Sequence, residues 1–364
     1  MNNHVMRRCS GLMLMLWCSS AFTAAAPDHV DLTWMSITNL YFEVGDQRIL
    51  ADGYFTRLPE SNFYGGGGGY KNTRAPFQSD VLAVKKVMEA LGGNSRFNLL
   101  LTGHSHFDHS FDTATWSSLT HARIIGAPTT CLQAQAQRIP AERCTSVFGG
   151  EKFELARGVV MYVIRWNHSG NSTDNPEQHN PVELSEPPHP DPVSGGLLAG
   201  VAEDFPNGGG NRAYLFVVDG KRGRFSWLFT DSAGFADINE PIVINGVNYG
   251  APLENLRATM KSAGVEAVNL WIATGGVPVA QIVLPIAKPK AYLPVHWDGL
   301  WYPFWKGVPY AWSDPELEVL LKQQGVTLVR PLQYMDKWRL DHEGVRPVPN
   351  DKVKKSLGFP QSGG

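Results

Sequence analysis

The stretch LLLTGHSHFDHS, residues 99–110, constrains the fold more than any other part of this chain. Its opening run of leucines is typical of a buried strand. Four side chains of the types that bind metals then fall within six residues: His104, His106, Asp108 and His109. Binding sites of α/β proteins commonly lie at the carboxyl ends of strands. The stretch therefore predicts a layered fold with a metal site at one edge of a sheet.

The spacing of these residues separates them into two pairs. In an extended segment alternate side chains face the same side, so His104 and His106 can bind one ion. If the chain turns after them, Asp108 and His109 can face a second ion. Imidazole nitrogens together with a carboxylate suit zinc and other borderline divalent metals. The competing interpretation is a chance cluster or a helix cap, and four ligand-type residues in one hexapeptide disfavour it.

Short strand patterns alternate with amphipathic helix patterns along most of the chain. We expect strands over residues 30–36, 39–44, 47–51, 97–102, 123–126, 159–165, 213–218, 224–230, 267–272, 291–294 and 327–330. We expect helices over residues 79–91, 129–137, 253–262 and 315–323, the first with Ser79 as its N-cap. Strands interleaved with helices predict a layered α/β fold.

The composition is that of a globular protein. The 364 residues are 43% hydrophobic and 18% charged, which suffices for one large domain or two small ones. No repeat with a period of about 20–50 residues and no sustained heptad is present. Repeat arrays and coiled coils are therefore disfavoured.

The first 26 residues have the three parts of a secretory signal peptide. Arg7 and Arg8 form a basic start, and LMLMLW, residues 12–17, is an apolar stretch too short to span a bilayer. Small residues at 23–26 offer cleavage sites, so we expect a secreted or periplasmic protein. Without this segment the chain has 30 basic and 34 acidic residues, a net charge of −4. This balance favours no nucleic acid partner, and no second apolar stretch is long enough to span a membrane.

Two cysteines, Cys131 and Cys144, remain after the signal segment is removed. An even pair in an oxidising compartment predicts a disulfide. Neither cysteine has the spacing of a metal ligand, so we assign them no catalytic role.

Three segments depart from the alternating pattern. Residues 169–212 are dense in Gly, Pro, Asn and Ser, and so long a loop inside a domain is typical of a functional lid or a partly disordered insertion. The five glycines at 65–69 predict either a surface loop or a mobile flap beside the site. Residues 336–364 are polar, and we expect them to form a C-terminal tail outside the domain.

The pattern H-x-H-x-D-H after a strand resembles that of the metallo-β-lactamase-fold hydrolases. Later strand ends supply matching residues in the family's order: His168 in RWNHSG, Asp231 in LFTDS and His296 in YLPVHW. Asp52, which closes RILAD, is similar to an early aspartate of that family that orients the metal site. One departure is Gly103, where the family usually has threonine before the first histidine. The resemblance covers about residues 30–330.

The resemblance implies a four-layer αββα sandwich, with one hydrolase domain over residues 27–335. It implies a first metal ion bound by His104, His106 and His168. It implies a second metal ion bound by Asp108, His109 and His296, with Asp231 bridging the two. Two divalent ions, expected to be Zn²⁺, share a water in such enzymes, lower its pKa toward neutrality and polarise the bond under attack. Asp108 is also expected to steer the proton, which makes it the catalytic residue.

The expected substrate is a small molecule, and the expected bond is an ester, a lactone or a phosphodiester. A β-lactam amide hydrolase and a non-catalytic binding protein with the same fold are the alternatives, and the sequence indicates no oligomeric state. Aromatic residues are dense after the last histidine, and the candidates for substrate contact are Trp297, Trp301 and Tyr302. The same segment continues with Phe304, Trp305, Tyr310 and Trp312. They predict either an aromatic wall for an apolar or ring-bearing substrate, or an aromatic mini-core that packs a loop.

Overall fold

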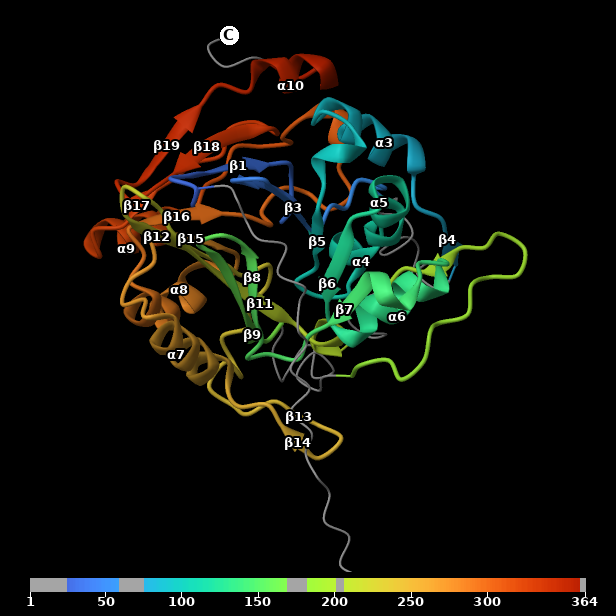
Figure 1. The fold of residues 1–364 in the computed structure, drawn as a ribbon, viewed down its shortest axis with the longest axis horizontal. Helices are drawn as coiled ribbons and strands as arrows, with labels where there is room; N and C mark the ends of the chain where they lie inside the picture. Colours follow the sequence, from blue (N-terminus) through green and yellow to red (C-terminus); the bar gives the residue numbers. More distant parts are fainter. Residues whose placement is uncertain (1–24, 59–74, 169–181, 201–205, 361–364) are drawn as a thin grey trace, which may run out of the picture.

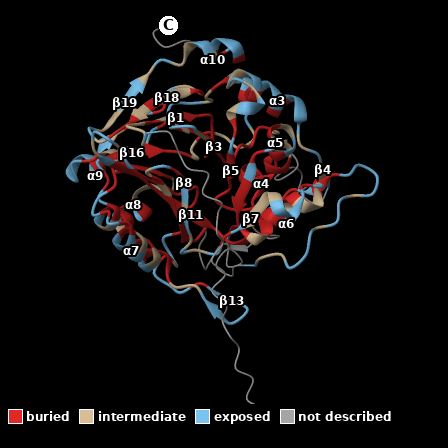
Figure 2. Ribbon diagram, viewed as in Figure 1, coloured by how far each residue is buried: buried red, intermediate tan, exposed pale blue. Residues whose placement is uncertain are grey.

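Two mixed β-sheets lie face to face, and helices cover the outer face of each (Figure 1). The structure is a computed structural model that describes residues 25–58, 75–168, 182–200 and 206–360. Within these residues the strands are buried at the centre, and the exposed positions lie mainly on helices and loops (Figure 2). The four-layer αββα sandwich expected from the sequence is confirmed by this arrangement.

The first sheet combines an antiparallel and a parallel half. β1, β2 and β3 are consecutive antiparallel strands, and β3, β5, β6 and β7 run parallel. The order across the sheet is β19 (Val345–Val348), β18 (Asp336–Leu340), β1 (Val30–Trp34), β2 (Leu40–Val44), β3 (Gln47–Ala51), β5 (Leu99–Leu101), β6 (Arg123–Gly126) and β7 (Cys144–Ser146).

The second sheet has the same design. β8, β9, β11 and β12 pair antiparallel, and β12, β15, β16 and β17 run parallel. The order across the sheet is β17 (Thr327–Leu328), β16 (Ala291–Pro294), β15 (Leu270–Ala273), β12 (Arg224–Phe229), β11 (Arg212–Asp219), β9 (Val159–Arg165) and β8 (Lys152–Ala156). Two short ribbons pair β4 (Pro76–Phe77) with β10 (Leu197–Leu198), and β13 (Val243–Ile244) with β14 (Val247–Asn248).

The helices fall into two groups, one for each sheet. On the side of the first sheet lie α3 (Val81–Ala90), α5 (Thr113–Thr120), α6 (Pro128–Ala136) and α10 (Asp351–Leu357). On the second sheet lie α7 (Pro252–Ala263), α8 (Gly276–Ala287) and α9 (Pro315–Gln323). A further single turn, α4 (Phe107–Ser110), follows β5. The expected N-cap of α3 was wrong by one residue, because Asp80 accepts from the amides of Leu82 and Ala83 while Ser79 donates to Asp112.

The core between the sheets is aromatic at its centre. The Phe42 ring of β2 lies 5.9 Å from the Phe216 ring of β11 and 5.7 Å from the Trp227 ring of β12. Along β11, Tyr214, Phe216 and Val218 face the first sheet, whereas Ala213, Leu215 and Val217 face the helices of the second layer. A strand that is buried on both faces has an unbroken run of apolar residues, and this run is why the strand could be predicted from the sequence.

The expectation of a polar tail after residue 335 was wrong. β18 pairs with β1 over five residues, and β19 pairs with β18 as the outermost strand of the sheet. Trp338 and Leu340 point into the core, while Arg339 and Lys337 form ion pairs with Asp31. The polar character that suggested a tail belongs to the solvated face of these edge strands.

Several expected features lie wholly or partly outside the described residues. These are most of the signal segment, the glycine run at 65–69, and residues 169–181 and 201–205 of the 169–212 insertion. One described part of the insertion, residues 182–200, runs past α6 to pair β10 with β4 (Figure 1), and residue 212 already belongs to β11. None of the helices in the described segments has the length and apolarity needed to cross a lipid bilayer.

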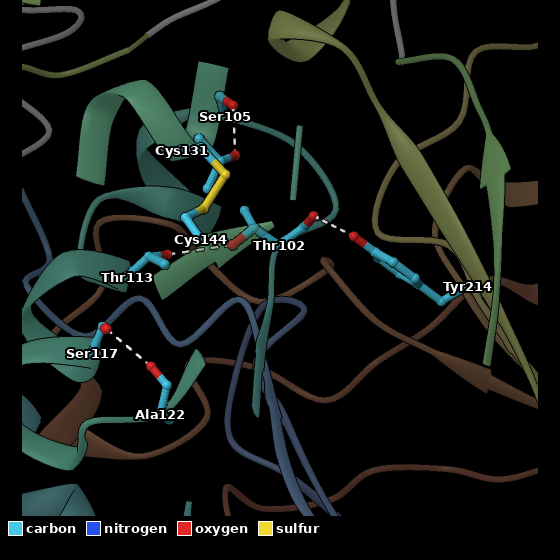
Figure 3. Close-up of a disulfide and its surroundings, with 9 residues drawn as sticks. Thr102, Ser105, Thr113, Ser117, Ala122, Cys131, Cys144 and Tyr214 are labelled. Carbon is cyan, nitrogen blue, oxygen red and sulfur yellow. Dashed lines mark hydrogen bonds between the residues drawn. A yellow bond between two sulfur atoms is a disulfide. The ribbon is translucent and has the colours of Figure 1, made fainter. Parts of the chain in front are cut away.

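The expected disulfide is confirmed. Cys131 of α6 is bonded to Cys144 of β7, so the outer helix is fixed to the edge of the first sheet (Figure 3). On the same helix, the Thr130 hydroxyl lies 2.9 Å from the Ser105 hydroxyl. The disulfide therefore secures a helix that contacts the segment between the first two histidines of the motif.

Ending the chain after Met335 is expected to prevent folding, because it removes β18, β19 and α10 and exposes the apolar edge of β1. The yield of soluble protein and the circular dichroism of the truncated chain measure this. A truncated protein that melts at the temperature of the full chain would contradict the assignment of these strands to the domain.

Replacing both cysteines, Cys131→Ser with Cys144→Ser, is expected to lower the free energy of unfolding by about 3 kcal/mol. The disulfide closes a loop with a sequence separation of 13 residues, and its loss frees the unfolded chain. Urea denaturation measures the change. As a control, a reducing agent should lower the stability of the wild type and leave the double variant unchanged.

Candidate metal centre

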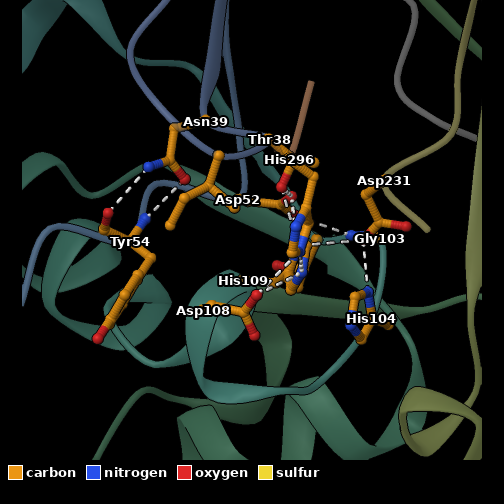
Figure 4. A network of polar contacts seen from close by, with 12 residues as sticks. Thr38, Asn39, Asp52, Tyr54, Gly103, His104, Asp108, His109, Asp231 and His296 are labelled. Atoms are coloured by element: carbon orange, nitrogen blue, oxygen red, sulfur yellow. Dashed lines mark hydrogen bonds and ion pairs between the residues drawn. The ribbon is translucent and has the colours of Figure 1, made fainter. Parts of the chain in front are cut away.

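Strand direction brings the site residues to one edge of the sandwich. β3 and β5 are parallel, as are β12, β15 and β16, and β9 runs in the direction of β12 because both are antiparallel to β11. The carboxyl ends of these strands therefore carry the candidate residues: Asp52 after β3, the histidine motif after β5, His168 after β9, Asp231 after β12 and His296 after β16. Figure 4 shows side chains from both sheets converging there.

The motif has the two-part geometry expected from its spacing. His106 is in an extended conformation and is the N-cap of α4, which begins at Phe107. The turn places Asp108 and His109 on the first helical turn, away from the extended part that carries His104. The predicted change of direction between the two pairs of ligands is therefore present.

Seven side chains form three overlapping groups, and within each group the candidate ligand atoms lie within 4.8 Å of one another. The groups are His104 with His106 and His168; Asp108 with His109 and His296; and His104 with His109 and Asp231. The first two groups are the two ligand sets expected from the sequence. The third places Asp231 against one histidine of each set. All seven are buried except His296, whose side chain is 23% exposed.

His109 is held at both ring nitrogens. Its Nδ1 lies 2.9 Å from the Thr38 hydroxyl and 2.9 Å from Oδ2 of Asp52. Its Nε2 lies 3.1 Å from Oδ2 of Asp108 and 3.1 Å from Nε2 of His296. Asp52 thus contacts one ring nitrogen, and the opposite nitrogen faces the second ligand group, which is the placement of a residue that orients a ligand.

Asp231 lies beside the same two rings. Its Oδ2 is 2.6 Å from Nδ1 of His104 and 3.4 Å from Nδ1 of His109. Among the described residues, its Oδ1 has no hydrogen-bond partner although it is buried, and the same holds for Nε2 of His104. Buried polar atoms are nearly always satisfied, so two such orphans in one cluster fit a site that holds a metal ion.

The charge of the cluster also fits a cation. Asp52, Asp108 and Asp231 are buried within one network, and in the described part of the chain no lysine or arginine is ion-paired with any of them. Uncompensated carboxylates are costly to bury, and several must share positive charge from a metal or from protonated histidines. Borderline divalent metals match this mixture of imidazole and carboxylate.

The pKa values follow from burial and from neighbouring charge. Burial raises the pKa of Asp231 to about 6, and burial lowers the pKa of His104 well below its usual value. Burial opposes ionisation of Asp108, but His109 and His296 outweigh it and hold the pKa of Asp108 well below its ordinary range. Burial likewise opposes a charged His109, yet Asp108 and Asp52 raise its pKa well above normal.

Two of the site residues have left-handed backbone conformations. Asp52 has φ of 58° and His296 has φ of 62°. Such conformations cost of order 1–3 kcal/mol for residues other than glycine and persist where surrounding contacts impose them. The amide of His296 donates to Ile37, and the amide of Ile37 donates to Asp298, so the loop after β1 fixes this histidine.

The aromatic segment after His296 is divided between two environments. Trp297 stacks on Trp34 and lines a cavity beside the site. Trp301 packs against the apolar cluster that contains Phe107 and Tyr54, while Tyr302 is 36% exposed. Of these three residues, Trp297 borders the cavity, and Tyr310 and Trp312 further along the chain line it as well.

Sequence reasoning missed two residues that support the site. Thr38 bonds Asp52 and His109 together, and Asp298 accepts from the Ile37 amide and the Tyr334 hydroxyl. Both are common polar residues in loops, and only their positions after β1 and after His296 set them apart. A search for polar residues one to four positions beyond each strand end would have included them.

The second half of the insertion is attached to the motif through the backbone. The Ser105 amide donates to the Gly208 carbonyl, and the Phe107 amide donates to the Gly200 carbonyl. Earlier in the insertion, Glu183 accepts from the buried Arg165 and Arg212. Gly200 and Gly208 of the insertion therefore lie directly against the histidine motif.

Comparisons with known proteins were made for the sequence and for the structure. No family model matches the sequence, and no curated protein matches it. The structure is similar to a metallo-hydrolase from the archaeon Ignicoccus hospitalis, with 13% identity and a TM-score of 0.46 over 86% of this chain and 99% of that one. It is also similar to a metallo-β-lactamase fold protein from Bacillus subtilis, with 12% identity and a TM-score of 0.45 over 86% of this chain and 99% of that one. A third similar structure is an isothiocyanate hydrolase from Delia radicum gut bacteria, with 10% identity and a TM-score of 0.47 over 84% of this chain and 98% of that one. At such values no activity transfers from these proteins to this chain.

Gly103→Ala is expected to weaken the binding of a divalent metal by about tenfold or more. A Cβ at Gly103 would lie 1.9 Å from Oδ2 of Asp231, so Asp231 must move away from His104 and His109. This close approach accounts for glycine before the first histidine. Zinc titration monitored by a competing chelator measures the affinity.

Gly299→Ala provides the matched control for that variant. A Cβ at Gly299 makes an ordinary 3.4 Å contact with Tyr302, so zinc affinity should stay at the wild-type value. Equal zinc affinity in Gly103→Ala and the wild type would contradict the placement of Asp231.

Proposed function

We propose that this protein is a secreted, metal-dependent hydrolase with two divalent ions, and that the ions are Zn²⁺. The observation that carries the proposal is the set of seven converging histidine and aspartate side chains, with His104 Nε2 and Asp231 Oδ1 buried and unpartnered. A purely structural role offers no reason to bury three carboxylates together.

The ligand assignment follows the three groups. His104, His106 and His168 hold the first ion, and Asp108, His109 and His296 hold the second. Asp231 contacts a histidine from each set, which supports its assignment as the bridging ligand. Asp52 and Thr38 keep the His109 ring in place from behind.

The chemistry of a hydrolase needs an activated water and a proton acceptor. When bound, two divalent ions supply a hydroxide nucleophile near neutral pH and stabilise the charge that develops on the leaving oxygen. We assign the role of proton acceptor to Asp108. Its low pKa keeps the carboxylate ionised, and Oδ2 contacts both His109 and His296.

The proposed substrates are small molecules with an ester, lactone or phosphodiester bond. The net charge of the chain is −2, and Gly200 and Gly208 of the insertion lie against the motif, which suits a small molecule rather than a nucleic acid. Hydrolysis of a β-lactam amide, and binding without catalysis, are the other outcomes that the experiment below distinguishes.

Export from the cytoplasm is part of the proposal. The segment at residues 1–26 has the pattern of a signal peptide, with cleavage expected near residues 23–26. The Cys131–Cys144 disulfide supports an oxidising compartment, because such bonds are rare in reducing ones.

The central prediction is that the purified protein binds about two zinc ions per chain and hydrolyses one class of substrate. Elemental analysis gives the metal content. The substrates are bis-p-nitrophenyl phosphate, p-nitrophenyl acetate, an acyl lactone and a chromogenic cephalosporin. Asp108→Asn should lower kcat by at least about a hundredfold, because it removes the proton acceptor.

Asp219→Asn, an exposed carboxylate far from the site, is the control and should retain wild-type turnover. Turnover of the cephalosporin alone would replace the proposed bond class with an amide. Metal binding without turnover would indicate a binding protein. Fewer than about 0.5 ions per chain after reconstitution would overturn the ligand assignment.

A further inference from the structure

A cavity of about 430 Å³ borders the metal centre. It lies at the carboxyl ends of β15 and β16, between the first turns of α8 and α9. His296 forms part of its wall, and Nε2 of His296 is 3.0 Å from Oδ2 of Asp108. The cavity therefore adjoins the metal centre, so that one ligand can have one group in the cavity and another at the metal centre. The volume is in the range of small-molecule sites.

Four aromatic side chains form part of the cavity wall: Tyr292, Trp297, Tyr310 and Trp312. Trp297 is fixed because it stacks on Trp34, with ring centroids 5.4 Å apart, and its Nε1 donates to the Pro294 carbonyl. Tyr310 is fixed because its hydroxyl donates to the Trp297 carbonyl. Rings that are already immobilised lose little conformational entropy when a ligand binds.

Tyr310 distinguishes this arrangement from a packed mini-core. Its side chain remains 55% exposed although it is held against the Trp297 carbonyl, and its ring centroid lies 5.9 Å from that of Trp297. A core residue would be buried by such contacts. The exposed ring instead offers a surface on which a flat ligand can pack in offset or edge-to-face geometry.

The cavity has a single acidic side chain in its wall. Among its described lining residues there is no lysine or arginine, and the one carboxylate is that of Asp314. Asp314 is the N-cap of α9 and accepts from the Leu317 amide at 3.0 Å, so it is held in place. Burial and the charge of Asp314 raise the pKa of Tyr292, which therefore stays a neutral hydroxyl. An uncharged ligand meets no repulsion here, whereas an anionic one faces Asp314.

We propose that this cavity binds an uncharged aromatic ring of the substrate, carried on one side of the bond that the metal centre cleaves. The reference to bond cleavage rests on the proposed function, whereas binding of the ring does not. The assignment makes Tyr310 and Trp297 specificity residues and gives Tyr302, which lies outside the cavity, no role in recognition.

The test is a ligand-observed NMR titration of the zinc-loaded, full-length mature protein. The probe is 2-naphthylmethanol, with cyclohexylmethanol as the non-aromatic comparison and naphthalene-2-sulfonate as the anionic one. The wild type should bind the naphthyl alcohol at least about fivefold more tightly than either comparison.

Two matched variants locate the binding site. Tyr310→Ala should weaken binding of the naphthyl alcohol at least about fivefold, and Tyr302→Ala, which removes an exposed aromatic outside the cavity, should leave it unchanged. Asp314→Asn keeps an N-cap for α9 and removes the charge, so binding of the sulfonate should become tighter. Absence of binding to the wild type, or equal losses in the two tyrosine variants, overturns the proposal.

Turnover of aryl and alkyl esters separates this proposal from the proposed function. Ring binding that depends on Tyr310, without turnover of any ester, lactone or phosphodiester, contradicts the hydrolase and supports the cavity assignment. Turnover without ring binding and without preference for aryl esters overturns the cavity assignment and leaves the hydrolase intact.

Discussion

The burial of three carboxylates among five histidines is the constraint on which the rest of the site depends. Asp52, Asp108 and Asp231 are within hydrogen-bond or ion-pair distance of His104, His109 or His296, and each is almost fully buried. The carboxylates of such a cluster repel one another unless positive charge lies between them, and the cluster is stable only where rigid elements hold it. The neighbouring structure supplies that rigidity through left-handed residues at Asp52 and His296 and through the Thr38 hydroxyl. The strain of these residues is therefore explained by the cluster that they hold.

The sandwich can hold this cluster because its two sheets repeat one design. In each sheet three antiparallel strands are followed by three parallel ones: β1, β2 and β3 with β5, β6 and β7, and β9, β11 and β12 with β15, β16 and β17. The sequence showed no short repeat, and the correspondence spans far longer stretches than a repeat array would. Both sheets thereby send their parallel carboxyl ends to the same edge, where side chains from either sheet can meet.

Strands and helices could be predicted from the sequence where their own residues carry a clear apolar pattern. β6, β9, β16 and α9 have the bounds that the apolar pattern predicted. α8 was missed because its glycines and Pro285 are typical of loops, although its first turn tolerates the glycines and its apolar residues are buried against the second sheet. β18 was missed because its identity depends on Asp31 and on the core side chains opposite, which lie some 300 positions away in the chain. The ligand residues were identifiable from spacing and order, whereas Thr38 and Asp298 were not, since their importance arises only from what they contact.

The two sheets contribute equivalent carboxylates, and His109 is where they meet. Asp52 follows β3 and Asp231 follows β12, the third antiparallel strand of each repeated unit, and both approach Nδ1 of His109, at 2.9 and 3.4 Å. One imidazole nitrogen cannot donate fully to two carboxylates, so the two compete for it. Asp52 is closer and also bonds to Thr38, whereas Asp231 is drawn toward His104 and retains an unpartnered oxygen. The asymmetry gives the two equivalent positions different surroundings. Asp52 has its partners in Thr38 and His109, whereas Asp231 has a buried oxygen without a partner among the described residues, which is why we propose Asp231 and not Asp52 as the metal ligand.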